Sequence, residues 1–226
     1  MLSLLISHLP DLSPLGVSLK VSCVATAIVF VGGTASAYGL RKYRGPGRSL
    51  LDSLLVAPLL LPPTIVGLGL LLLLGQQGPL GRWFGSGLVF TWYGAVVAAI
   101  VVAFPLMYRS ALIAFEAIDP LLLEAARLDG ASEWQVLRHL VLPLAGPGLG
   151  GGVVLTFARA FGEFGATVMV AGNIPGQTQT IPMALYFAVE SGSLGEAKFW
   201  AIVALGLCFT VILVLNRFFW DLGRLS

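Results

Sequence analysis

Residues 53–81 read SLLVAPLLLPPTIVGLGLLLLLGQQGPLG, a run that contains no Lys, Arg, Asp or Glu. A helix of about 20 apolar residues is long enough to cross the hydrocarbon core of a bilayer. The whole chain is 57% hydrophobic and 11% charged, whereas soluble domains carry about 25% charged residues. So few charges cannot cover a water-exposed surface, and the sequence therefore predicts a protein embedded in a lipid bilayer.

Four further stretches without these charged residues approach or exceed the length of a membrane-spanning helix. They are Val21–Leu40, Trp83–Tyr108, His139–Ala158 and Phe199–Asn216. The sequence therefore predicts an all-α polytopic membrane protein with about five transmembrane helices, over residues 16–40, 51–74, 88–108, 145–171 and 198–216. No linker or internal repeat divides it, so residues 1–226 are expected to form one domain, whose core covers about 15–219.

Basic residues predict the orientation of these helices, because cytosolic loops are enriched in Lys and Arg. The loops after the first, third and fifth helices hold most of them: Arg41, Lys42, Arg44, Arg48, Arg109, Arg127, Arg138, Arg217 and Arg224. The opposite side has only Lys20, Arg82 and Lys198. We therefore expect the N-terminus outside and the C-terminus in the cytosol.

Residues 173–197 hold a further apolar stretch, which Pro175, Gly176 and Pro182 interrupt. A complete sixth span there would place the C-terminal arginines outside, against the charge rule. We expect instead a short re-entrant or external helix over about 181–189.

Proline and glycine mark places where helices bend or approach closely. Pro58, Pro62 and Pro63 fall in the second span and Pro105 in the third, and each removes a helix hydrogen bond and favours a bend. Glycines crowd the start of the fourth span, where the pair at 148 and 152 has the small-x-x-x-small spacing of helix contacts. This cluster indicates ordinary helix packing or, alternatively, a flexible joint.

A short charged segment between the third and fourth spans has the signals of a helical hairpin. Asp119 can cap a helix that begins at Pro120, and Gly130 can end it in a left-handed turn. Ser132 and Gln135 then form a capping box for a second helix. Four leucines are expected to hold the hairpin against the membrane: Leu121, Leu122, Leu128 and Leu137. On pattern alone, the segment could also be an interfacial amphipathic helix that only orders a loop.

The spacing within this hairpin adds a resemblance to a known family. Glu124-Ala125-Ala126, three residues, Gly130, nine residues, Leu140, one residue and Leu142-Pro143 is similar to the signature loop of permease subunits in binding-protein-dependent ABC importers, with Leu140 in place of the usual Ile. In that superfamily the loop docks into a cleft on the ATP-hydrolysing subunit. The resemblance implies that Glu124 is a charged contact, that Ala125 and Ala126 pack closely, and that Gly130 forms the turn.

A second stretch resembles one branch of that superfamily. Residues 157–186 read FARAFGEFGATVMVAGNIPGQTQTIPMALY, which is similar to molybdate ABC transporter permeases. Sulfate permeases share Gly-Glu-Phe-Gly and Gly-Asn, so a sulfate or thiosulfate importer is the alternative. The resemblance implies a homodimer in the cytoplasmic membrane that imports molybdate, or tungstate, by alternating access. It also implies two ATPase subunits, which bind ATP and Mg²⁺, and an external oxyanion-binding protein; no cofactor is expected on this chain.

Arg159 and Glu163 are the ionisable residues expected well inside a span, where an unpaired charge costs at least a few kcal/mol. Their i, i+4 spacing places them on one helix face. Three interpretations remain open: a structural ion pair, an arginine that draws the anion through the pore, and a glutamate that couples protons.

Neutral hydrogen-bonding side chains gather at the expected outer mouth: Asn173, Gln177, Thr178, Gln179 and Thr180. Neutral donors suit transient passage of an anion, since a strong site would trap it. The alternative is that they only satisfy the backbone of a loop. With Arg159 and Glu163, residues 173, 178 and 180 are the candidates for the translocation path.

Other classes of function lack their motifs. The sequence contains no Gly-x-x-x-x-Gly-Lys-Ser/Thr, no His-Glu-x-x-His and no Gly-x-Ser-x-Gly, so neither ATP binding nor an enzyme is expected. A secondary anion transporter would show two related halves, and none is visible. Cys23 and Cys208 fall in separate spans, which argues against a metal site or disulfide. A net charge of +2 gives no indication of nucleic-acid binding.

Overall fold

The computed structural model describes residues 11–84 and 87–223. Every secondary-structure element that it contains within these ranges is a helix. Four helices are long: α2 (Ser13–Lys42), α6 (Trp92–Glu116), α9 (Leu142–Phe161) and α12 (Leu194–Gly223). Shorter ones connect them: α3 (Arg48–Leu60), α4 (Pro63–Leu74), α5 (Gly81–Phe84), α7 (Pro120–Leu128), α8 (Glu133–Val136), the π-helix η2 (Leu137–Val141), α10 (Gly165–Ala171) and α11 (Ile181–Glu190). The predicted fold class is confirmed.

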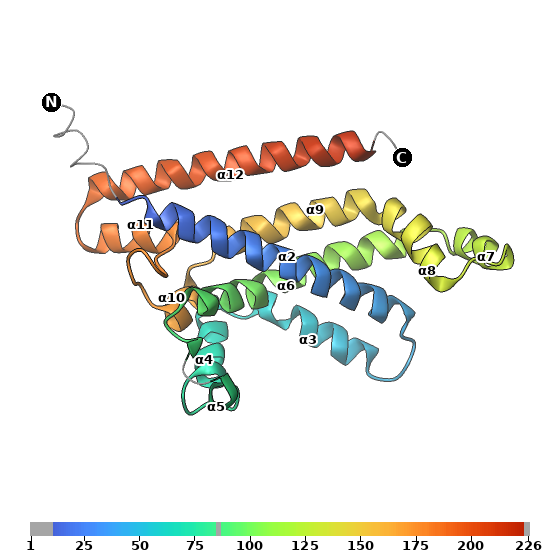
Figure 1. Cartoon of the computed structure of the whole chain (residues 1–226), viewed down its shortest axis with the longest axis horizontal. Coiled ribbons are helices and arrows are strands. Elements are labelled where there is room, and N and C mark those ends of the chain that lie inside the picture. Colours follow the sequence, from blue (N-terminus) through green and yellow to red (C-terminus); the bar gives the residue numbers. More distant parts are fainter. Residues whose placement is uncertain (1–10, 85–86, 224–226) are drawn as a thin grey trace.

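Helices α2, α6 and α9 form the centre of the molecule, with α12 lying along α9 (Figure 1). Their shared core holds the buried Val29, Met107, Tyr108 and Phe115. Two glycines of α9 face α6 at close range: a Cβ on Gly148 would lie 2.6 Å from Cβ of Ala114, and one on Gly152 would lie 2.8 Å from Cβ of Ser110. The interpretation of this spaced pair as a packing surface is therefore confirmed.

The second span is broken, as its prolines predicted. Helices α3 and α4 meet at an angle of 111°, and the break falls at Leu61-Pro62, directly before Pro63 opens α4. Since proline has no N–H to donate, two consecutive prolines interrupt the helical hydrogen bonds. Counting this bent pair as one span gives up to five membrane-spanning segments within the described residues, in agreement with the sequence.

Polar contacts hold α3 against α6. The carboxylate of Asp52 accepts a hydrogen bond from the Tyr108 hydroxyl at 2.6 Å and one from Nη2 of Arg109 at 2.8 Å. Arg48 pairs with Glu116 at 3.2 Å. These contacts fix the direction in which the broken span enters the bundle.

The fourth span differs from its prediction. We expected one helix over residues 145–171, but α9 ends at Phe161 and α10 begins at Gly165. No proline causes this break. Glycines flank it, and Glu163, between them, bonds with the backbone of the next helix. The other spans extend beyond their predicted ends, by eight residues beyond Tyr108 in α6 and by seven beyond Asn216 in α12.

The short helix predicted over 181–189 is present as α11, Ile181–Glu190. It is tied to α2 because the Ile181 amide donates a hydrogen bond to Oγ of the buried Ser18 at 2.8 Å. Figure 1 shows α11 and the start of α2 at one end of the bundle, whereas α7, α8 and the end of α12 lie at the other. The molecule thus has two distinct ends, each with its own candidate site.

Candidate functional site

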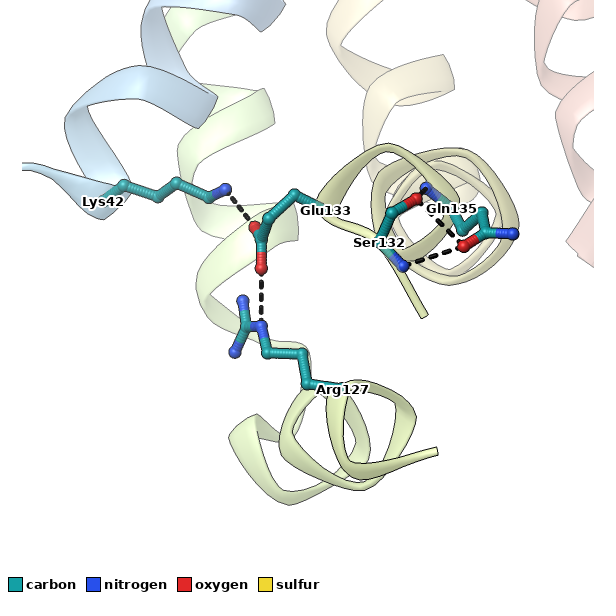
Figure 2. Close-up of polar contacts among 5 residues, drawn as sticks. All are labelled: Lys42, Arg127, Ser132, Glu133 and Gln135. Atoms are coloured by element: carbon teal, nitrogen blue, oxygen red, sulfur yellow. Dashed lines mark hydrogen bonds and ion pairs between the residues drawn. The ribbon is translucent and has the colours of Figure 1, made fainter. Parts of the chain in front are cut away.

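The hairpin at the end of α6 has the predicted caps. Oδ1 of Asp119 accepts a hydrogen bond from the Leu121 amide at 2.9 Å, and Pro120 is the first residue of α7. Gly130 has φ +86°, a left-handed conformation that an L side chain rarely adopts. Ser132 and Gln135 form the capping box of α8, with the Ser132 amide 2.8 Å from Oε1 of Gln135 (Figure 2). Each element of this local prediction is confirmed.

An ion-pair network that the sequence did not reveal holds the hairpin to α2. Glu133 lies between two cations: Oε2 is 2.5 Å from Nζ of Lys42, at the end of α2, and Oε1 is 2.6 Å from Nε of Arg127, at the end of α7 (Figure 2). The hydrogen bonds from Arg127 and Lys42 lower the pKa of Glu133 to about 2. This carboxylate is therefore ionised at any physiological pH.

The leucines of the hairpin differ in what they contact, and whether they hold the hairpin against the membrane stays a prediction. Only Leu137 of the four packs against the bundle. Leu121, Leu122 and Leu128 are 70%, 51% and 88% exposed, whereas Leu123 is buried and makes the contact with the core. Sequence reasoning missed Leu123 because neighbouring leucines at 121–123 cannot all face one side of a helix, and the pattern did not show which one turns inward. The hairpin therefore presents an apolar face away from the bundle.

The residues of the signature spacing occupy two settings. Glu124, Ala125 and Gly130 are exposed on the hairpin, and Ala126 packs partly against the core. Leu142 and Pro143 form the start of α9, which continues without interruption from α8 through η2. The wide π-helical turn ends at Val141, two residues before Pro143, which lacks the N–H that a regular helical turn requires. Their role in docking stays a prediction.

Arg159 and Glu163 do form an ion pair, at 2.7 Å between Nη1 and Oε2. Glu163 does not continue the helix of Arg159, since α9 has already ended. Its side chain is 2% exposed against 27% for Arg159. The second carboxylate oxygen accepts a hydrogen bond from the Ala166 amide, at 2.7 Å, in the first turn of α10. Glu163 therefore bridges the break in the fourth span, which favours the structural interpretation of the pair.

The breaks in the second and fourth spans lie against each other. A Cβ on Gly165, the first residue of α10, would be 3.0 Å from Cβ of Pro63, the first residue of α4. One on Gly67 would be 2.8 Å from Cα of Ala166. Because such distances leave no room for a methyl group, the two short helices are in backbone contact. The structure thus brings together two interrupted helices, as occurs at substrate sites of many transporters.

The polar residues of the expected outer mouth have different settings. Thr178 is buried; its Oγ1 donates a hydrogen bond to the Gly172 carbonyl and accepts one from the Ile174 amide, both at 3.0 Å. Oδ1 of Asn173 and Oγ1 of Thr180 are buried without a partner in the residues that the structure describes. Gln177 is exposed and Gln179 partly so. Thr178 thus orders the loop, and the role of this group in anion passage stays a prediction.

Comparison with known proteins places these features in a family. Residues 28–221 match the model of the family "Binding-protein-dependent transport system inner membrane component". The chain is 42% identical to the molybdenum transport system permease protein ModB of Escherichia coli (strain K12), covering 91% of this chain and 92% of that protein. It is 36% identical to the sulfate transport system permease protein CysW of Synechocystis sp., covering 91% and 75%.

The fold has a counterpart among solved structures. A chain of a bacterial ABC transporter involved in the import of the polysaccharide alginate superposes with a TM-score of 0.77 at 17% identity, covering 96% of this chain and 82% of that chain. Such a low identity supports the fold alone. The family match extends over most of the chain and includes both candidate sites. This chain therefore belongs to the family of binding-protein-dependent transport system inner membrane components.

Proposed function

We propose that the chain is the permease subunit of an ATP-driven importer that carries molybdate across the cytoplasmic membrane. The observation that carries this proposal is the 42% identity to the E. coli molybdenum permease over 91% of the chain. The sulfate permease CysW reaches 36%, which makes sulfate or thiosulfate the second candidate. Tungstate, an oxyanion of the same shape and charge as molybdate, is expected to share the route.

The hairpin end of the bundle faces the cytosol in this proposal, with the N-terminus outside and the C-terminus inside. Charge distribution supports the assignment: Arg127 and Arg138 lie on the hairpin, Arg41 lies in the last turn of α2, and Arg44 lies in the loop after it. Cytosolic loops carry such an excess of basic residues. The end of α12 lies at the same end of the bundle (Figure 1).

The exposed face of α7 is the surface that would meet the ATPase subunit. Leu121, Leu122 and Leu128 are more than half exposed, and Glu124 lies exposed among them. An apolar face with a central charge fits a cleft on another protein better than it fits water. In this arrangement ATP and Mg²⁺ stay on the partner, and the present chain only moves.

Two copies of the chain, two ATPase subunits and an external oxyanion-binding protein would make up the transporter. Closure of the ATPase subunits on ATP would draw the two hairpins together. A translocation cavity between the two copies of the chain would then open to the outside, where the binding protein delivers the anion. Hydrolysis would return the cavity to the cytosol. Each ligand shifts the equilibrium only by its different affinity for the two states.

The test is uptake of labelled molybdate by liposomes that contain the assembled complex, with its binding protein outside and ATP inside. We expect ATP-dependent uptake that excess unlabelled tungstate suppresses and excess sulfate does not. The matched control is the same complex loaded with a non-hydrolysable ATP analogue. Suppression by sulfate, together with uptake of labelled sulfate, would favour the second candidate. Uptake without any ATPase subunit would contradict the whole proposal.

A further inference from the structure

A cleft of about 340 Å³ lies between the end of α2 and the hairpin. We call it the basic cleft, because its rim consists of Arg41, Lys42, Arg44 and Arg127. Leu123, Val136 and Val141, all buried, form its apolar floor. The residues of the signature spacing do not line this cleft, and neither do the exposed Leu121 and Leu122.

The charges in the basic cleft are unbalanced. Glu133 is the one carboxylate in its lining, which also holds four cations. It pairs with Lys42 and Arg127 and so fixes the ends of both side chains. Arg41 and Arg44 make no ion pair with any side chain that the structure describes. Like charges gathered in a concave site raise the local concentration of anions, so this cleft favours an anionic occupant.

The position of the cleft relative to the membrane indicates which anion it binds. The charge-free stretch of α2 ends at Leu40, and Arg41 follows at once. In the proposed orientation this places the rim at the level of the phosphates of the inner leaflet. That surface carries anionic lipids, and basic pockets beside membrane helices on this side hold their headgroups. The apolar floor suits the glycerol and ester part of a lipid better than it suits a fully hydrated free anion.

We propose that the basic cleft binds the phosphate headgroup of an anionic phospholipid of the inner leaflet, with Arg41 and Arg44 as its uncommitted donors. The proposal rests on the orientation assigned above. Because the cleft has α2 on one side and the hairpin on the other, a bound lipid ties the hairpin to the membrane. The position of the hairpin then depends on the lipid composition around the transporter.

The test compares lipid retention by the full chain in detergent, measured by native mass spectrometry with phosphatidylglycerol and with phosphatidylcholine. We expect wild type to retain phosphatidylglycerol preferentially. In the double variant Arg41→Gln/Arg44→Gln, the affinity for phosphatidylglycerol should fall several-fold, since both cations of the cleft that Glu133 does not neutralise are removed. The matched control is Arg138→Gln/Arg217→Gln, which removes two exposed charges from the same end, outside the cleft. It should behave as wild type.

A second variant gives an effect of opposite sign. Glu133→Gln removes the carboxylate that neutralises Lys42 and Arg127, so it should bind phosphatidylglycerol more tightly than wild type. A misfolded protein would not gain affinity in this way. Unchanged or weaker binding by this variant would count against the proposal, as would equal retention of the two lipids by wild type.

A competition with inorganic phosphate tests whether the anion in the basic cleft is a lipid headgroup or a free oxyanion. We expect millimolar phosphate to leave phosphatidylglycerol in place, because the free ion gains nothing from the apolar floor. If phosphate displaces the lipid in wild type but not in Arg41→Gln/Arg44→Gln, the cleft is a site for a free oxyanion and the lipid assignment is wrong. None of these measurements involves transport, so their failure would leave the molybdate proposal standing, and failure of uptake would leave the lipid measurement intact.

Discussion

At the scale of single residues, the pair of Arg159 and Glu163 carries the most specific chemistry inside the membrane-spanning part. Its two members are unequally placed: the carboxylate is almost completely buried, while about a quarter of the Arg159 side chain is exposed. Removing one partner of a buried ion pair leaves the other uncompensated, at a cost of about 3–5 kcal/mol. The cost should therefore depend on which partner is removed.

Arg159→Gln is expected to destabilise the chain more than Glu163→Gln does. Arg159→Gln leaves a buried carboxylate unpaired. Glu163→Gln leaves only a guanidinium that reaches solvent, and the new glutamine still has an oxygen that can accept the hydrogen bond from the Ala166 amide. We expect a loss near the lower end of that range for Arg159→Gln, about 3 kcal/mol, and a smaller one for Glu163→Gln. Thermal unfolding in detergent measures both, with the exposed Arg138→Gln as control.

The double variant Arg159→Gln/Glu163→Gln should recover part of the stability lost by Arg159→Gln, because it buries no charge. The reverse order of the two single variants would contradict the structural interpretation. If both single variants unfold like wild type but do not support uptake, the pair belongs to the translocation path instead.

At the scale of elements, the hairpin is tied to the bundle, since ion pairs join α7 and α8 to each other and to the end of α2. Its turn depends on Gly130, whose φ of +86° is incompatible with the φ of about −65° that proline requires. A change at the turn should therefore alter the hairpin without affecting the bundle.

Gly130→Pro and Glu124→Lys are each expected to abolish uptake in the assembled complex while the chain still inserts into the membrane and the ATPase subunits still hydrolyse ATP. Gly130→Asn is the matched control, because asparagine tolerates the left-handed region. The ratio of anions transported to ATP hydrolysed measures the effect. Normal uptake by both test variants would rule out a docking role for the hairpin.

The elements also show how far sequence reasoning extends. Caps and turns depend on residues close in sequence, so Asp119, Gly130 and Ser132 were enough to predict the hairpin. The link between Lys42 and Glu133 joins residues 91 positions apart, and nothing in their local sequence pairs them. Prolines predicted the break at Pro62. The break after Phe161 has instead two flanking glycines and the hydrogen bond that Glu163 accepts from the Ala166 amide, which a count of apolar residues cannot detect.

At the scale of the whole molecule, the bundle leaves two kinds of apolar surface exposed. The face of α12 belongs to a regular helix, and Ile202 is 70% exposed there. Leu60, beside the break in the second span, is 81% exposed. Non-helical backbone at membrane depth is tolerated only where protein covers it or water fills a cavity beside it. We therefore expect lipid on α12 and a second copy of the chain opposite α3 and α4.

Cross-linking tests this arrangement. In a background with Cys23 and Cys208 replaced by serine, Leu60→Cys should join two copies through a short bifunctional thiol reagent. Ile202→Cys, on the surface assigned to lipid, is the matched control. Its thiol should be modified by one end of the reagent without joining two copies of the chain. Dimers measured by gel electrophoresis should be several-fold more abundant for Leu60→Cys. Preferential cross-linking through Ile202→Cys would place the two-fold axis at α12.

The contact between Gly67 and Ala166 limits how such a dimer can open and close. At this contact Gly67 lies against the backbone of Ala166 and Cβ of Met169, so the two helices pack closely and we expect α4 and α10 to move together. The two helix breaks beside this contact, at Leu61-Pro62 and at Gly162–Phe164, are where we expect the chain to bend when the two helices move. Opening on one side of the membrane would then be geometrically linked to closing on the other.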